Sequence, residues 1–272
     1  MLRVISAAIF LTFSSIFAFA QTQPPSGTTA QPAPAPKKPT PKSKATAKPT
    51  GQTDSSACDL GVIPAAGSPI EVKKVGITIF GNETSELPSD AWGIDDLIFA
   101  RVRAAAGAGI AVRRIAYAKD AFETYNRPEK NATRDARENF TAIIRQIAAK
   151  SRCTRYIVIA RYSGSLPGTN QALTGVGVYT HGPFGKAAVF AFTRIVVLDG
   201  QTFAIRQDPL GSFGARMSTV LSRVMKDDSV RAANTDFPST LEEAATNPKL
   251  RDTVRGLLAE KLDSILPVYL KE

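Results

Sequence analysis

Alternating strand and helix patterns over residues 70–162 constrain the fold of this chain more than any other feature. Residues 70–80 are the first predicted strand of this alternation, and it ends in a nearly continuous apolar run over 75–81, which is typical of a strand buried on both faces. Residues 110–117 and 156–162 are the next predicted strands, and a helical pattern separates each pair. Because strands separated by helices are joined by right-handed crossovers, this order predicts parallel strands covered by helices.

The two helices of this region are predicted over residues 94–106 and 136–148, where apolar side chains recur at helical spacing. Gly107 follows the first of them and is a typical helix end. A short strand over residues 60–64 and a turn at residues 67–69 are predicted to precede the whole alternation.

The pattern changes after residue 162. Residues 173–180 and 187–198 are predicted strands, and Asp199-Gly200 is a tight turn into a strand over 201–207. We therefore expect an antiparallel hairpin at one edge of the sheet.

Helices complete the chain. One is predicted over residues 213–224. The last has its apolar positions over 250–265, with Asn247 as its N-cap and Pro248 as its first residue. The predicted fold class is α/β, with a mixed and mainly parallel sheet, helices on its faces, an antiparallel edge hairpin and C-terminal helices.

The chain divides into three predicted regions: a signal peptide over 1–20, a tether over 21–54 and a single α/β domain over 55–272. Arg3 is followed by an apolar run that ends in Ala18-Phe19-Ala20, the small-x-small pattern of a signal-peptidase site. We therefore expect a periplasmic or secreted protein. An uncut signal would instead act as a membrane anchor, and no later segment is long enough to cross a bilayer.

The predicted tether is basic and rich in proline. Residues 21–54 contain eight prolines, five lysines and one aspartate but no aromatic residue, so they cannot bury enough apolar surface to fold. A segment whose charges are nearly all positive is suited to contact with an envelope protein or an anionic envelope polymer. The alternative is that the segment is only a soluble spacer. The charge pattern does not favour a nucleic-acid partner.

The chain has two cysteines, Cys58 and Cys153, and export would permit a disulfide between them. Both precede predicted strands, and parallel strands share their amino-terminal edge. We therefore predict a Cys58–Cys153 disulfide, the alternative being two buried thiols.

Chemical motifs are scarce in this sequence. His181 is the only histidine and lies in a predicted turn, so a loop residue is favoured over a catalytic base. The sequence lacks the ligand spacings of zinc sites and the glycine patterns of phosphate-binding loops, so neither a metal nor a cofactor is expected. Asp95 and Asp96 fall in the first turn of a predicted helix, where they stabilise its dipole.

A candidate binding region follows the first apolar strand. In parallel sheets, ligands bind outside the carboxyl ends of the strands, where loops converge. The loop predicted over residues 81–90 is such a place, and the candidate binding residues there are Asn82, Glu83, Glu86 and Trp92. Trp92 is either part of this surface or a residue that packs the helix entry onto the core.

Four stretches resemble a group of signal-bearing bacterial envelope proteins without an assigned activity: residues 75–83, 91–97, 113–118 and 199–203. The resemblance spans most of residues 58–207 and implies no activity. The order of elements is also loosely similar to that of the TolB amino-terminal domain and related envelope lipoproteins, which implies an interaction module in the periplasm. The lipid-attachment cysteine of those lipoproteins is missing here.

The sequence therefore favours an exported, non-enzymatic interaction module. One alternative is a hydrolase that uses carboxylates such as Glu83 or Asp95 with loop serines at the sheet edge. Another is an inert component of a cell-surface assembly.

Overall fold

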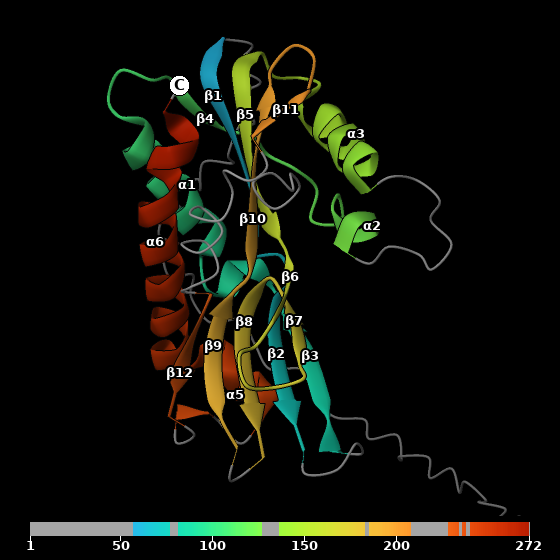
Figure 1. Ribbon diagram of the computed structural model, residues 1–272, viewed down its shortest axis with the longest axis vertical. Helices are drawn as coiled ribbons and strands as arrows, with labels where there is room; N and C mark the ends of the chain where they lie inside the picture. Colours follow the sequence, from blue (N-terminus) through green and yellow to red (C-terminus); the bar gives the residue numbers. More distant parts are fainter. Residues whose placement is uncertain are drawn as a thin grey trace, which may run out of the picture. The chain divides into compact units, whose positions relative to one another are not determined.

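The computed structural model describes residues 57–76, 81–126, 136–182, 185–207, 228–233, 236–237 and 240–271 (Figure 1). All of them belong to one compact unit, Gly51–Glu272. The predicted signal peptide, the whole predicted tether and the helix predicted over 213–224 lie outside the described residues.

The first five-stranded sheet, called sheet A, has three parallel strands at one side and an antiparallel hairpin at the other (Figure 1). Its central parallel strand, β1, pairs with β5 and β4, and β10 runs antiparallel to β5. The predicted edge hairpin is confirmed, because β11 is the edge strand and pairs with β10. In sheet order the strands are β11 (Ile205–Gln207), β10 (Thr193–Asp199), β5 (Cys153–Arg161), β1 (Cys58–Ala65) and β4 (Val112–Arg114).

The second five-stranded sheet, sheet B, contains one parallel pair, β2 with β8, between antiparallel strands. A two-stranded ribbon of β6 and β7 joins the sheets. Sheet B consists, in order, of β12 (Ser229–Ala232), β9 (Ala187–Ala191), β8 (Val176–His181), β2 (Ile70–Val75) and β3 (Glu83–Leu87); the ribbon is β6 (Ser163–Ser165) and β7 (Ala172–Thr174).

The end of α1 and the start of α6 lie where local sequence signals predict, whereas α6 continues past the predicted end at residue 265 to Leu270. Gly107 ends α1 with a positive φ of 83°. The side chain of Asn247 accepts hydrogen bonds from the first turn of α6, and Pro248 is the first residue of that helix. The helical segments are η2 (Ser89–Ala91), α1 (Ile94–Ala106), α2 (Glu123–Asn126), α3 (Ala136–Ala148), α5 (Leu241–Thr246) and α6 (Pro248–Leu270).

Helices cover both faces of sheet A, because successive residues of each strand point to opposite sides. Leu60 and Ile157 face one side and pack with residues of α1 and α6. Ile63 and Val158 face the other side and pack with α3 through Phe140 and its neighbours. The α/β class with parallel and antiparallel strands is therefore confirmed.

The assignment of strands to a single sheet is wrong. The strand predicted over 70–80 is β2 of sheet B as far as the structure describes it, whereas β4 and β5 belong to sheet A. The loop predicted over 81–90 contains β3, which forms a hairpin with β2. The strand predicted over 187–198 is divided at Phe192 into β9 and β10, one in each sheet. Apolar runs identify buried strands but not the sheet in which each one pairs.

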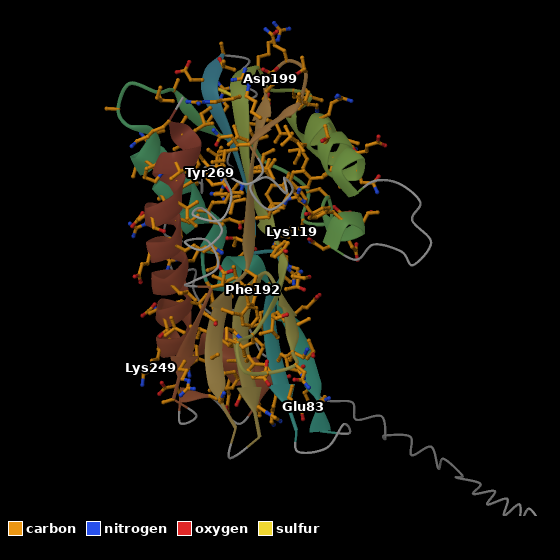
Figure 2. All side chains as sticks on the ribbon, in the orientation of Figure 1. Glu83, Lys119, Phe192, Asp199, Lys249 and Tyr269 are labelled. Atoms are coloured by element: carbon orange, nitrogen blue, oxygen red, sulfur yellow. A yellow bond between two sulfur atoms is a disulfide. The ribbon has the colours of Figure 1, made fainter. Side chains whose placement is uncertain are left out.

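Three connections pass between the two sheets at one junction. Tyr162 follows β5, Gly175 precedes β8 and Phe192 separates β9 from β10. Their backbones form a closed triangle of hydrogen bonds: Tyr162 N–H to Phe192 O at 3.0 Å, Phe192 N–H to Gly175 O at 2.8 Å, and Gly175 N–H to Tyr162 O at 3.0 Å. Figure 2 labels Phe192 at this junction.

The predicted disulfide is present. Cys58 and Cys153 open β1 and β5, are register partners in that parallel pair and are joined through their sulfurs, with a Cα–Cα distance of 4.4 Å. The bond closes a loop with a sequence separation of 95 residues.

Helix α6 is also fastened to sheet B by a buried lysine. Lys261 is 3% exposed, donates a hydrogen bond to Ala191 O at 2.9 Å and pairs with Asp228, just before β12. Burial lowers the pKa of the Lys261 ammonium group, and the charge of Asp228 opposes that shift. This pair links the helix to the edge of sheet B.

Candidate functional site

A cavity of about 260 Å³ opens beside the junction of the sheets. Each of the three parallel strands of sheet A contributes lining residues, which lie either at the carboxyl end of the strand or in the segment that follows it. The cavity is therefore at the edge where parallel sheets bind ligands. It is lined by Ser68 and Pro69 after β1, by Lys119, Asp120, Glu123 and Asn126 after β4, by Arg161 at the end of β5, and by Glu86 of β3.

Two buried charged residues hold the wall of this cavity. Glu71 accepts a hydrogen bond from Thr174 N–H at 2.9 Å, and Arg161 donates one to Thr174 O at 3.1 Å. The Glu71 and Arg161 residues are 9% and 6% exposed. The peptide groups of Thr174 are thus held from both sides, which fixes the Arg161 guanidinium group at the cavity.

The pKa of the Glu71 carboxyl group is set mainly by burial. Desolvation raises the pKa of the Glu71 carboxyl group, while the hydrogen bond from Thr174 and the charges of Lys73 and Arg161 lower it. Glu86 lies directly opposite Glu71 in the β2–β3 pair, and its negative charge raises that pKa further.

Asp95 supports the turn that forms another wall. This residue, in the first turn of α1, accepts a hydrogen bond from Gly67 N–H at 3.3 Å and one from the Tyr117 hydroxyl at 2.9 Å. The same hydroxyl lies 2.8 Å from Pro64 O, so its one proton is donated to either acceptor. Burial raises the pKa of Asp95, against the lowering effect of these hydrogen bonds.

The open side of the cavity carries exposed charges of both signs. Lys119 pairs with Asp90 at 2.7 Å, and both side chains are more than two-thirds exposed, so the pair contributes little to stability. Glu123 is also exposed. The cavity is smaller than the 300–1,000 Å³ typical of drug-sized sites. Its lining can form ion pairs and hydrogen bonds with one side chain or another small polar group.

Only one of the predicted binding residues lies at this cavity, and it is Glu86. Asn82 instead accepts a hydrogen bond from Gly76 N–H at 3.1 Å. Glu83 pairs with Lys74 at 3.7 Å, at the end of β2 away from the junction (Figure 2). The hairpin of β2 and β3 separates these side chains because a strand, and not a compact loop, carries them.

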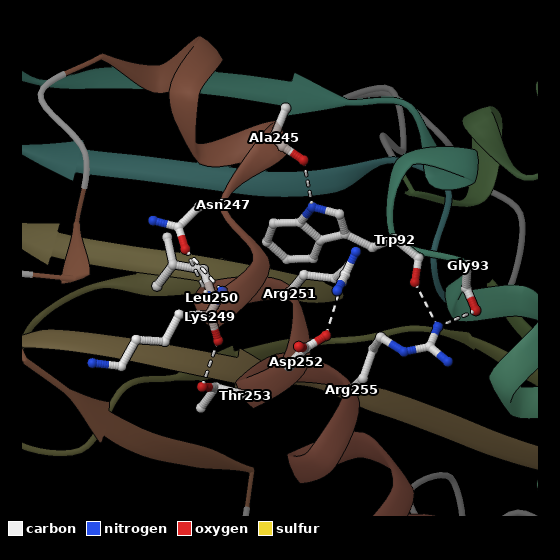
Figure 3. Close-up of polar contacts among 10 residues, drawn as sticks. All are labelled: Trp92, Gly93, Ala245, Asn247, Lys249, Leu250, Arg251, Asp252, Thr253 and Arg255. Carbon is white, nitrogen blue, oxygen red and sulfur yellow. Dashed lines mark hydrogen bonds and ion pairs between the residues drawn. The ribbon is translucent and has the colours of Figure 1, made fainter.

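Trp92 is not part of a binding surface. Its residue is 1% exposed, and its indole N–H donates a hydrogen bond to Ala245 O at 2.9 Å (Figure 3). Arg255 of α6 donates to the carbonyls of Trp92 and Gly93, at 2.6 and 2.9 Å. The prediction of a recognition role is therefore wrong, and the alternative, packing of the helix entry onto the core, is confirmed.

The residues named for a hydrolase do not form one site. Asp95 contacts the turn at Gly67, before β2, whereas Glu83 pairs near the opposite end of that strand. His181, predicted in a turn between strands, is instead the last residue of β8, where it pairs with Val75 of β2, and it is exposed. Asp96 pairs with Arg114 beside the start of α1.

The sequence analysis missed most of the cavity lining. Lys119, Asp120 and Glu123 lie in a segment without apolar periodicity, so no pattern indicated their place. Arg161 did carry a signal, because it is a charged residue at the end of the apolar strand β5. A charge that stays buried at a strand end needs partners, and Thr174 provides one.

Within the described residues, no group of three or more histidine, cysteine, aspartate or glutamate side chains is placed to hold a metal ion. None of the helices in this part of the chain combines the length and apolar character needed to span a bilayer.

No family model and no curated protein matches this chain. Among solved structures, it is similar to protein XCC0632 from Xanthomonas campestris, of family model DUF330, with 10% identity and a TM-score of 0.25 over 82% of this chain and 89% of that one. It is also similar to lipoprotein GNA1162 from Neisseria meningitidis, with 13% identity and a TM-score of 0.21 over 74% and 96% of the two chains. Neither likeness is close enough to support a conclusion about function.

Proposed function

We propose that this protein is exported and acts as a binding module, in which the cavity at the sheet junction recognises a polar or charged group of a partner. The observation that carries this proposal is the cavity itself. Its lining comes from the carboxyl ends of three parallel strands and presents both acidic and basic side chains. Buried contacts of Glu71, Arg161 and Asp95 hold its walls, so the site is formed before any ligand binds.

Export is supported by two independent features. The first twenty residues have the pattern of a cleavable signal, and the domain carries a disulfide between β1 and β5. Disulfides persist in oxidising compartments such as the periplasm or the outside of the cell. N-terminal sequencing of the protein from whole bacteria should give a chain that starts near Gln21. A chain that retains Met1 and stays in the cytosol would contradict export.

Binding at the cavity is tested by crosslinking in living cells. A photoreactive amino acid at Glu123, which is exposed at the cavity, should give a discrete adduct with a partner. The same substitution at Glu260, exposed on α6, serves as the control and should give no such adduct.

A second variant ties the adduct to the charge of the cavity. Glu86→Lys, in the chain labelled at position 123, reverses an exposed charge of the lining and should abolish the adduct. The thermal midpoint should stay within a few degrees of the parent, as is usual for surface substitutions. An equal adduct from position 260, or an adduct that survives the charge reversal, would refute a binding site at the cavity.

A further inference from the structure

The end of sheet A away from the cavity carries a different surface, which we call the basic end. Its location follows from the packing of α1 against α6. Gly93 accepts a hydrogen bond from Arg255, and Arg101 pairs with Asp263 at 2.7 Å. The second contact lies eight residues after the first in both helices. The two helices therefore run parallel and end side by side, at Ala106 and Leu270 (Figure 1).

The strands of sheet A bring further residues to the same end. Cys58 N–H donates to Arg152 O at 3.1 Å, and Asp59 N–H donates to Ala111 O at 3.0 Å. The segment before β5 and the loop before β4 thus both lie beside the first residues of β1. The described chain enters the fold here, at Cys58 of β1.

Exposed basic side chains define this surface. Four of them, named at the end of this paragraph, form no ion pair within the described part of the chain. Two carboxylates also lie at this end. Asp59 accepts a hydrogen bond from Ala111 N–H at 2.7 Å, and Asp199 accepts hydrogen bonds from its own turn and from Arg206, contacts that lower the pKa of Asp199. The four residues of the basic end are Arg103, Lys150, Arg152 and Lys271.

An apolar loop lies among these charges. Residues 107–111 read Gly-Ala-Gly-Ile-Ala, and the first three are exposed. With Phe99, this loop lines a hollow of about 640 Å³, which Arg103 borders. Val268, at the end of α6, is 43% exposed, which is unusual for a large apolar side chain in the described residues.

We propose that the basic end docks on the headgroup surface of a bilayer that contains anionic phospholipids. Lysine and arginine side chains next to a membrane are attracted to anionic lipid headgroups. Apolar residues beside them gain by entering the boundary between headgroups and acyl chains. An anionic polymer would satisfy the charges but would leave the apolar loop exposed to water, so the combination favours a lipid surface.

Vesicle partitioning of the full chain tests this inference. The protein should bind phosphatidylglycerol–phosphatidylcholine vesicles and should bind pure phosphatidylcholine vesicles much more weakly. Each basic residue near an anionic surface contributes roughly fivefold, so Lys150→Gln with Arg152→Gln should weaken partitioning roughly 25-fold. Both side chains are exposed and lie between α3 and β5, outside the regular elements.

A matched double variant controls for the loss of charge. Arg231→Gln with Lys249→Gln removes the same charge from β12 and from the first turn of α6, at the other end of that helix from Lys271 (Figure 2). This variant should retain nearly all of the vesicle binding. Equal partitioning of the two double variants would overturn the assignment of the basic end.

The apolar loop is tested separately. Ala108→Asp places a carboxylate in the exposed loop and should lower vesicle binding at least tenfold, whereas Ala108→Ser should lower it less than twofold. Thermal melts would establish that each variant is folded. Full binding by Ala108→Asp, or capture of the protein by soluble dextran sulfate without any binding to vesicles, would overturn docking on lipid. None of these variants touches the cavity, so the result is independent of the proposed function.

Discussion

A single residue without a side chain makes the sheet junction possible. Gly175 has a φ of +76°, and its N–H and C=O groups belong to the triangle of hydrogen bonds with Tyr162 and Phe192. A Cβ atom at this position would lie 2.5 Å from Nε of Arg161. Both the backbone angle and the space beside the cavity therefore require glycine here.

Gly175→Ala should destabilise the domain by about 1–3 kcal/mol, because a residue with a side chain is strained in this conformation. The thermal midpoint should fall by roughly 3–10 °C. Gly109→Ala is the matched control, since a Cβ atom there meets nothing within 4 Å. Chemical denaturation of both variants is the measurement. Equal stability of the two would contradict the role given to Gly175.

At the scale of elements, the disulfide joins β1 and β5, two neighbouring parallel strands of sheet A. Register pairing of Cys58 with Cys153 places the bond at the amino ends of β1 and β5. Because the closed loop is long, the bond restricts the unfolded chain strongly and stabilises the fold in the chain-entropy model. The basic end lies around this bond, so its geometry depends on the same pairing.

Replacement of both cysteines by serine should cost on the order of 4–5 kcal/mol in the chain-entropy model. The thermal midpoint should fall by roughly 10–20 °C. Reduction of the natural protein should give the same lower midpoint, whereas a reductant should not affect the double variant. A midpoint that neither reduction nor substitution changes would show that the bond contributes nothing to stability.

At the scale of the whole molecule, we expect the segment before the domain to act in binding and not in folding. Deletion of residues 21–53 should leave the thermal midpoint of the domain unchanged, because the three hydrophobic clusters of the described residues are built from residues 58–270. The deletion should weaken partitioning to anionic vesicles, since it removes five lysines from the chain. A loss of folded stability as large as the loss of binding would count against this division of roles.

Much of the fold was predictable because its signals are local. Asn247 and Pro248 start α6, Gly107 ends α1, and Asp199-Gly200 turns β10 towards β11. These outcomes depend on the conformational preferences of a few neighbouring residues, so no knowledge of distant contacts was needed. The candidate site was less predictable: Glu86 was found, but Asn82 and Glu83 lie away from the cavity and Trp92 is buried.

The sequence by itself determined the α/β class, the pairing of the two cysteines and the alternation of β1, α1, β4, α3 and β5, but not β3 or the division of residues 187–198 into two strands. The tertiary structure alone decided that the strands divide between two sheets and that the chain crosses between them at Tyr162, Gly175 and Phe192. It also decided that Arg161 and Glu86 meet at one cavity. The physical reason is that a buried strand needs apolar residues in its own sequence, so the strand can be recognised locally. Which strand it pairs with depends on residues far away in the chain.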